Sequence, residues 1–157
     1  MQPHEMLNMI DIEYPALLKE SGPKVRAYPI ETIFAEKVEA MVKLGMTNSR
    51  LKDYYDLIVL SETFELAGVV LTEAVCATFG RRETPLPSGL AAGLTDEFVT
   101  ASEVRWKAFL SANDLRDMPP KLADAVARLR TFVSPVLEAA AKGKTVPERW
   151  IPPKGWT

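Results

Sequence analysis

The sequence predicts a mainly α-helical fold, a bundle of about five helices preceded by a short β element. Two long stretches, 30–84 and 88–118, contain no proline and place apolar residues at helical spacing. The runs with strand character are confined to the N-terminal 28 residues. Hydrophobic residues make up 47% and charged residues 25% of the 157 residues, which favours a single globular domain over a disordered chain.

Residues 1–28 contain two short runs with strand character, 9–14 and 25–28, each next to proline. They predict a short β element, although an isolated hairpin is only marginally stable in water. The expected organisation is therefore a β element over 1–28, a helical domain over 29–144 and an extended tail rich in tryptophan and proline over 145–157.

Two helices are expected between Pro29 and Phe64. Pro29 suits a first helical turn, and the 3.6-residue apolar period that follows it ends at Gly45. The second helix is expected after Asn48 and Ser49, either of which can cap it, and runs to about Phe64. The short connection between the two helices is typical of an antiparallel pair.

A third and a fourth helix are expected on either side of one long loop. Thr72 is the expected cap of the third helix, and the loop covers 83–94. Thr95 is expected to cap the fourth helix, because acidic residues follow it in the first turn, beside the partial positive charge of the helix end.

The fifth helix is expected to begin at Pro120. Pro135 should kink this helix, because proline removes one backbone donor and crowds the carbonyl of Thr131. In the tail that follows, Trp150 and Trp156 are expected to pack back onto the helices through their indole rings.

Single copies of cysteine and histidine exclude several kinds of site. Cys76 and His4 allow neither an internal disulfide nor a zinc cluster, and Cys76 is expected to be a small buried residue. A hydrolase triad would have to use His4, close to the N-terminus, where catalytic geometry is hard to fix. Because no run of about 18 apolar residues is present, we expect a cytoplasmic protein that does not enter a membrane.

One charged side chain interrupts the apolar face of each of the first two helices. Lys37 lies in the middle of this face on the first helix, while Glu39 and Lys43 lie on the opposite, polar side. On the second helix Asp53 lies on the apolar line, four residues before Leu57. Because an unpaired buried ammonium group is unfavourable, antiparallel packing predicts that Lys37 meets Asp53.

Two interpretations of this pair remain open from the residues alone. In the first, Lys37 and Asp53 form a buried ion pair that sets the register of the two helices. In the second, Lys37 and Arg50 hold an anionic substrate such as a nucleotide phosphate, and Asp53 or Asp56 orients them or activates a hydroxyl group. Such a phosphate site would use neither a GxxxxGK[ST] nor a GxGxxG loop, since the sequence contains neither.

Two motifs that contain these residues resemble those of a known family. The segments AYPIETIFAEK at 27–37 and NSRLKDYYDL at 48–57 are similar to the paired "YP-E…AEK" and "R-x-KD…DL" motifs of AbiEii/AbiGii-type nucleotidyltransferase toxins. These proteins belong to toxin–antitoxin and abortive infection systems. The resemblance continues through ATFGRRET at 77–84 and WKAFL at 106–110 to the closing tryptophans, and so covers nearly the whole chain.

The resemblance implies a fold related to DNA polymerase β-like nucleotidyltransferases. In that family an N-terminal sheet carries a Gly-Ser or Gly-Gly motif followed by a DxD pair that holds magnesium, and a helical C-terminal half completes the nucleotide site. The sequence contains no such Gly-Ser…DxD combination. The resemblance therefore implies that the chain is a truncated form, the C-terminal half alone, with 1–28 as a remnant of the sheet.

The same resemblance suggests roles for four residues. Lys37 would contact the nucleotide phosphates, Asp53 would orient or assist the reacting group, and Arg50 and Asp56 would complete the nucleotide-binding site. It also implies Mg²⁺ and a nucleoside triphosphate for the full-length family, an RNA acceptor and a cognate antitoxin protein. Neither Mg²⁺ nor the nucleoside triphosphate is expected to bind tightly to this chain alone. No nucleotide transfer is expected from this chain alone either. The alternative is a non-catalytic helical interaction module in which Lys37 and Asp53 form a structural ion pair.

Overall fold

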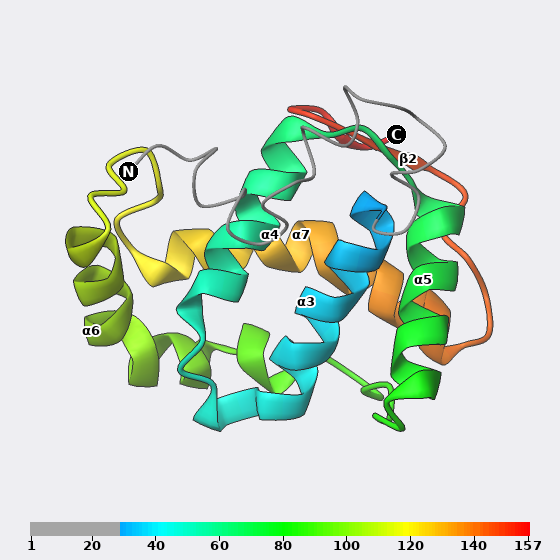
Figure 1. Ribbon diagram of the computed structural model, residues 1–157, viewed down its shortest axis with the longest axis horizontal. Helices are drawn as coiled ribbons and strands as arrows, with labels where there is room; N and C mark the ends of the chain where they lie inside the picture. Colours follow the sequence, from blue (N-terminus) through cyan, green and yellow to red (C-terminus); the bar gives the residue numbers. More distant parts are fainter. Residues whose placement is uncertain (1–28) are drawn as a thin grey trace.

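The computed structural model describes residues 29–157, and the β element expected over 1–28 lies outside this range. The described part is mainly helical, as the sequence predicts (Figure 1). It also contains one small sheet, which was not predicted from the sequence. In the numbering of Figure 1, the α-helices are α3 (Ile30–Leu44), α4 (Leu51–Thr63), α5 (Gly68–Arg81), α6 (Asp96–Ala112) and α7 (Leu122–Ala141). The strands are β1 (Leu66–Ala67), β2 (Arg149–Ile151) and β3 (Gly155–Trp156), and short 3-10 turns cover Gly45–Thr47 and Ala92–Leu94.

Helix α3 lies between α4 and α5, and α7 runs across the same bundle (Figure 1). The first turn of α3 follows Pro29, and the helix ends at Gly45, whose φ of 52° lies in the left-handed region that favours glycine. Phe34, Val38 and Met41 are fully buried. Because neighbours cover α3 on more than one side, one charged residue of this helix, Glu39, is buried together with the apolar ones.

Helix α4 is buried along most of its length. Every residue from Asp53 to Ser61 is buried, although the segment contains two aspartates. The helix begins after Asn48, whose side-chain oxygen accepts a hydrogen bond of 2.7 Å from the backbone N–H of Arg50. Asn48 thus stabilises the turn before α4, while Arg50 occupies the position just before the first helical residue.

The expectation that Thr72 caps the third helix is wrong. Helix α5 begins one turn earlier, at Gly68, and the Thr72 hydroxyl donates to the Gly68 carbonyl at 2.7 Å. The Gly68 N–H donates to Glu148 of the tail at 2.9 Å, and a Cβ at Gly68 would lie only 2.5 Å from the Glu148 oxygen. A contact distant in sequence thus fixes the start of α5. Cys76 on this helix is exposed, contrary to expectation, because it lies on the outer side of α5.

The expected start of α6 is confirmed. Thr95 accepts a hydrogen bond of 3.2 Å from the Phe98 N–H through its side-chain oxygen. Helix α7 begins at Leu122, two residues after the expected Pro120. The reason is tertiary, since the Glu103 carboxylate of α6 accepts from the Leu122 N–H at 3.2 Å and so caps α7 from outside.

Helix α7 contains Pro135, the residue at which the sequence predicts a kink, and the helix continues beyond it to Ala141. Proline leaves the Thr131 carbonyl without its usual helical donor. The Trp156 indole N–H donates to this carbonyl at 3.2 Å and also lies 3.3 Å from the Phe132 carbonyl. The tail therefore satisfies the backbone group that the proline leaves free.

The last residues return to the helices and form the sheet. Strand β2 lies between β1 and β3 and pairs antiparallel with both. The Trp150 indole N–H donates to the Ser61 carbonyl in the last turn of α4 at 2.7 Å. Trp150 and Trp156 both pack against Phe132, with ring centroids 4.6 and 6.4 Å away, so the expected docking through the indoles is confirmed.

Candidate functional site

The packing of α3 against α4 places Lys37 between two buried carboxylates. The Lys37 ammonium lies 3.1 Å from Asp53 Oδ1 and 3.2 Å from Asp56 Oδ2. The first contact is also a hydrogen bond. The sequence predicts the meeting of Lys37 with Asp53, and the structure adds Asp56 as a second, almost equidistant partner.

Two further cations contact the outer sides of these carboxylates. Arg50 Nε lies 3.3 Å from Asp53 Oδ2, and Lys52 Nζ lies 2.9 Å from Asp56 Oδ2. The five residues form a chain of alternating charge, Arg50, Asp53, Lys37, Asp56 and Lys52, which we call the ionic chain. Sequence reasoning missed Lys52, although its spacing of four residues from Asp56 on one helix is a recognised signal for an ion pair.

Exposure in the ionic chain increases from the carboxylates to the cations. The side chains of Asp53 and Asp56 are 2% and 0% exposed, that of Lys37 is 16% exposed, and those of Lys52 and Arg50 are 31% and 59% exposed. Three cations face two carboxylates, so a positive charge remains uncompensated. An anion that approached from solvent would meet the cations first.

The two carboxylates are not fully satisfied. Asp53 Oδ2 and Asp56 Oδ1 are buried and have no hydrogen-bond partner among residues 29–157. The contact of Arg50 with Asp53 Oδ2 lacks hydrogen-bond geometry. Burial raises the pKa of Asp56 to about 6, against the opposing effect of Lys52 and Lys37. Asp56 therefore changes its charge close to neutral pH.

The two tyrosines between these aspartates fix α4 in the core. The Tyr54 hydroxyl donates to the Gly93 carbonyl at 2.8 Å, and its ring stacks on Phe98 at 5.2 Å. The Tyr55 ring packs edge-on against Phe109 at 6.3 Å. Burial raises the pKa of both phenols, so both remain neutral over the physiological range. These contacts hold the segment that presents Asp53 and Asp56.

The ionic chain fits an anion better than a metal ion. Among the described residues, 29–157, no group of three or more His, Cys, Asp or Glu is arranged to hold a metal. Mg²⁺ takes oxygen ligands, whereas Asp53 and Asp56 already face the ammonium groups of Lys37 and Lys52. The partly exposed cations instead suit phosphate oxygens.

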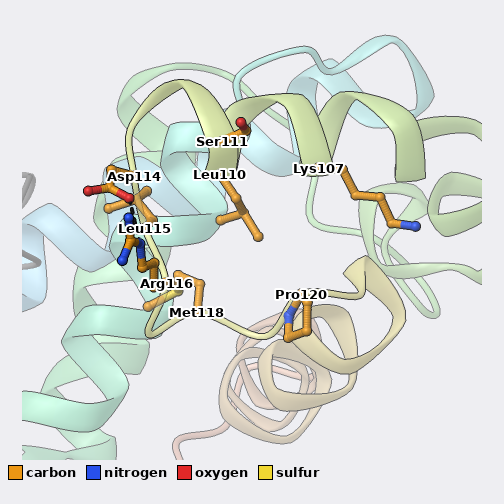
Figure 2. Close-up of a pocket in the computed structure, with 8 residues that line it drawn as sticks. All are labelled: Lys107, Leu110, Ser111, Asp114, Leu115, Arg116, Met118 and Pro120. Carbon is orange, nitrogen blue, oxygen red and sulfur yellow. Dashed lines mark hydrogen bonds and ion pairs between the residues drawn. The ribbon is translucent and has the colours of Figure 1, made fainter.

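A separate hollow lies between the end of α6 and the start of α7, with a volume of about 460 Å³. Figure 2 shows Leu110 and Met118 pointing into it, with Lys107 and the Asp114–Arg116 ion pair at its rim. No member of the ionic chain lines this hollow. It therefore presents a mixed apolar and charged surface apart from the site on α3 and α4.

A comparison with protein-family models identifies a family for this chain. The model described as "Nucleotidyl transferase AbiEii toxin, Type IV TA system" matches residues 4–128 and so includes the whole ionic chain. Neither the curated proteins nor the solved structures give a significant match. Within the described residues, no helix is both long enough and apolar enough to cross a membrane.

Proposed function

Since the chain belongs to the AbiEii family of nucleotidyltransferase toxins, we propose that its helices supply the nucleotide-binding part of a nucleotidyl transfer site. The donor would be a nucleoside triphosphate and the acceptor an RNA. Lys37 and Arg50 would bind phosphate oxygens, Asp53 would orient Lys37 and assist the reacting group, and Asp56 would complete the site. A cognate antitoxin would restrain the active protein.

The single observation that carries this proposal is the position of Lys37. Its ammonium lies within 3.2 Å of both Asp53 and Asp56, and the Lys37 side chain as a whole is 16% exposed. A buried lysine is stabilised by pairing with a carboxylate, and one such partner is enough to compensate its charge. Here a second carboxylate and two more exposed cations surround it, which is the charge arrangement that positions and stabilises a phosphate group.

The proposal gives the described residues binding and positioning roles only. When bound, a divalent cation supplies neutralisation of the charge that develops on the phosphates. Asp53 and Asp56 do not fit its ligand set, and the sequence carries no Gly-Ser…DxD combination. The metal carboxylates would thus come from another segment or polypeptide, and we expect no nucleotide transfer by the 157-residue chain alone.

The test is incorporation of a labelled nucleoside triphosphate into RNA. We expect incorporation by the protein made from the intact locus, and a loss of about 100-fold or more for Lys37→Ala, the usual cost of removing one charge stabiliser. Lys107→Ala on α6 is the matched control, because Lys107 is exposed and makes no ion pair with any described residue. Full incorporation by Lys37→Ala would contradict the proposal. Lys37-dependent incorporation by the 157-residue chain alone would instead contradict the expectation that this chain is inactive by itself.

The alternative, a non-catalytic interaction module, has one observation in its favour. The Lys37–Asp53 contact joins α3 to α4 beneath the surface, as a structural strut would. The double variant Lys37→Met with Asp53→Leu separates the two functions, since a well-packed apolar pair replaces a buried ion pair at little cost. Retained stability with retained function of the locus would favour the strut, whereas retained stability with lost function would favour the nucleotide site.

A further inference from the structure

We propose that Lys52 is a positioning residue of this site, whose ammonium holds Asp56 so that Lys37 stays shared between Asp53 and Asp56. This inference rests on the proposed function for its consequence in nucleotide binding. Its structural basis is independent of that function. It assigns a role to a residue that sequence reasoning did not select.

The first argument is the length of the contacts. Lys52 Nζ to Asp56 Oδ2, at 2.9 Å, is the shortest contact within the ionic chain and is also a hydrogen bond. Arg50, the other outer cation, lies 3.3 Å from Asp53 without hydrogen-bond geometry and is 59% exposed, so solvent screens it more strongly. Lys52 is therefore the stronger of the two outer partners.

The second argument is the balance of charge at Lys37. One ammonium group cannot compensate two buried carboxylates, yet Lys37 lies 3.1 and 3.2 Å from Asp53 and Asp56 without favouring either. Lys52 on Asp56 and Arg50 on Asp53 supply the missing charge from both sides. Without Lys52, Asp56 would keep one cation and one unpartnered oxygen.

The loss of Lys52 has two possible outcomes, and both change the site. Asp56 either takes up a proton, which removes its hold on Lys37, or draws Lys37 away from Asp53. In both cases the ammonium is no longer shared. The effect of Lys52 on a bound phosphate would therefore act through Asp56 and Lys37.

The placement of Lys52 favours positioning over direct contact with a ligand. Lys52 and Asp56 lie one turn apart on α4, so the pair forms within one helix and does not depend on α3. Lys37, on the other helix, remains the cation that joins the two carboxylates.

The first test measures the NMR signal of the Asp56 carboxyl carbon as a function of pH in the 157-residue chain. The Asp56→Asn variant identifies which signal belongs to Asp56. The charged groups that contact Asp56 are Lys37 from α3 and Lys52 from α4, with Asp53 as their neighbour. Lys52→Met should raise the midpoint of the Asp56 titration by about one pH unit, and Lys52→Arg should largely restore it. Lys107→Met is the control and should leave the midpoint unchanged.

The second test measures binding of inorganic triphosphate to the same variants by NMR titration. We expect weak binding by the parent chain, none by Lys37→Met, binding about 3- to 10-fold weaker by Lys52→Met, and near-parent binding by Lys52→Arg and Lys107→Met. Circular dichroism of each variant verifies that the helices are retained.

The outcomes separate this inference from the proposed function. An unchanged Asp56 midpoint in Lys52→Met overturns the positioning role, whatever happens to binding. A shifted midpoint with unaltered triphosphate binding also overturns it, because the shared ammonium would then have no consequence. If the parent binds no triphosphate, the nucleotide site fails, and the Asp56 titration alone decides whether Lys52 positions Asp56.

Discussion

Glu39 on α3 and Asp56 on α4 are both buried carboxylates that contact cations, and their oxygens are satisfied to different degrees. Glu39 on α3 is 2% exposed, and its two oxygens accept from different donors, Arg82 at 2.8 Å and Thr84 at 2.5 Å. Asp56 on α4 is 0% exposed and receives both of its lysines on Oδ2, whereas no described residue donates a hydrogen bond to Oδ1.

The pKa values of the two groups follow this difference. Burial by itself raises the pKa of both carboxyl groups. At Glu39 the hydrogen bonds from Thr84 and Arg82 outweigh burial and lower the pKa. At Asp56 two lysines on one oxygen do not outweigh burial, and the pKa rises to about 6. At Glu39, donors on both oxygens stabilise the charged form in a structural contact. At Asp56, both cations contact one oxygen, and the carboxylate can still take up a proton or respond to a ligand.

The largest expected difference between the two regions is in activity. In the protein made from the intact locus, Asp53→Asn should lower nucleotide transfer to RNA about 100-fold, because it removes the charge that orients Lys37. Glu39→Gln should leave the rate within about 3-fold, because it changes a structural contact and no group of the site. Comparable losses in both variants, measured with labelled nucleoside triphosphate at saturation, would remove the functional distinction.

The next effect concerns stability. Glu39→Ala should lower the free energy of unfolding by about 2 kcal/mol, because it leaves Arg82 and Thr84 without their buried acceptor. The loss is limited to this size because Arg82 is 41% exposed and water can solvate it. Glu36→Ala is the matched control on the same helix. Glu36 is 42% exposed and lies 3.6 Å from Arg82, so its loss should cost less than about 0.5 kcal/mol. Urea unfolding of both variants measures the difference, and equal losses would contradict the structural role of Glu39.

The dependence of stability on pH should have opposite sign at the two carboxylates. The folded-state pKa of Asp56, about 6, lies above its ordinary value of 3.8, so the folded state binds the extra proton and Asp56 contributes stability as the pH falls from 7 towards 4. The contribution of Asp56 to the difference in unfolding free energy between pH 7 and pH 4 should be roughly 1–3 kcal/mol, and Asp56→Asn should remove it. The pKa of Glu39 is lowered, so its contribution is present above about pH 4.5 and is lost on further acidification.

Chemical unfolding of the parent and Asp56→Asn at pH 5 and pH 8 measures this slope. Asp124→Asn on the exposed side of α7 is the control and should follow the parent. If the parent and Asp56→Asn gave the same difference between the two pH values, Asp56 would not have a raised pKa.

The smallest effect tests a third polar group, the Thr131 carbonyl freed by Pro135. Trp156→Phe keeps a ring on Phe132 but removes the indole donor, and it should cost about 1 kcal/mol. In a Pro135→Ala background the helix itself supplies a donor to Thr131, so the same substitution should cost less. A double-mutant cycle by thermal unfolding measures the coupling between residues 135 and 156. Zero coupling would mean that the indole does not act through this carbonyl.

Several local features of the protein could be predicted from the amino-acid sequence, although the starts of α5 and α7 could not. Helical periodicity predicted the order of the helices, and Thr95 was identified as the cap of α6 from its own neighbours in the chain. The meeting of Lys37 with Asp53 was predictable because a short turn joins their helices and each interrupts an apolar face. The paired motifs that contain them also indicated the family that the family model matches.

The surroundings of Glu39 and Asp56 depend on tertiary contacts and could not be predicted from the sequence. Glu39 falls on the polar side of α3 in the sequence, yet it is buried because the end of α5 and the residues after it, with Arg82 and Thr84, cover that side. The division of Lys37 between Asp53 and Asp56, and the unpartnered oxygen of Asp56, likewise depend on how α3 sits against α4. Periodicity tells which face of a helix is apolar, but it contains no information on which distant segment covers the other faces, and that segment sets the number of donors at each buried charge.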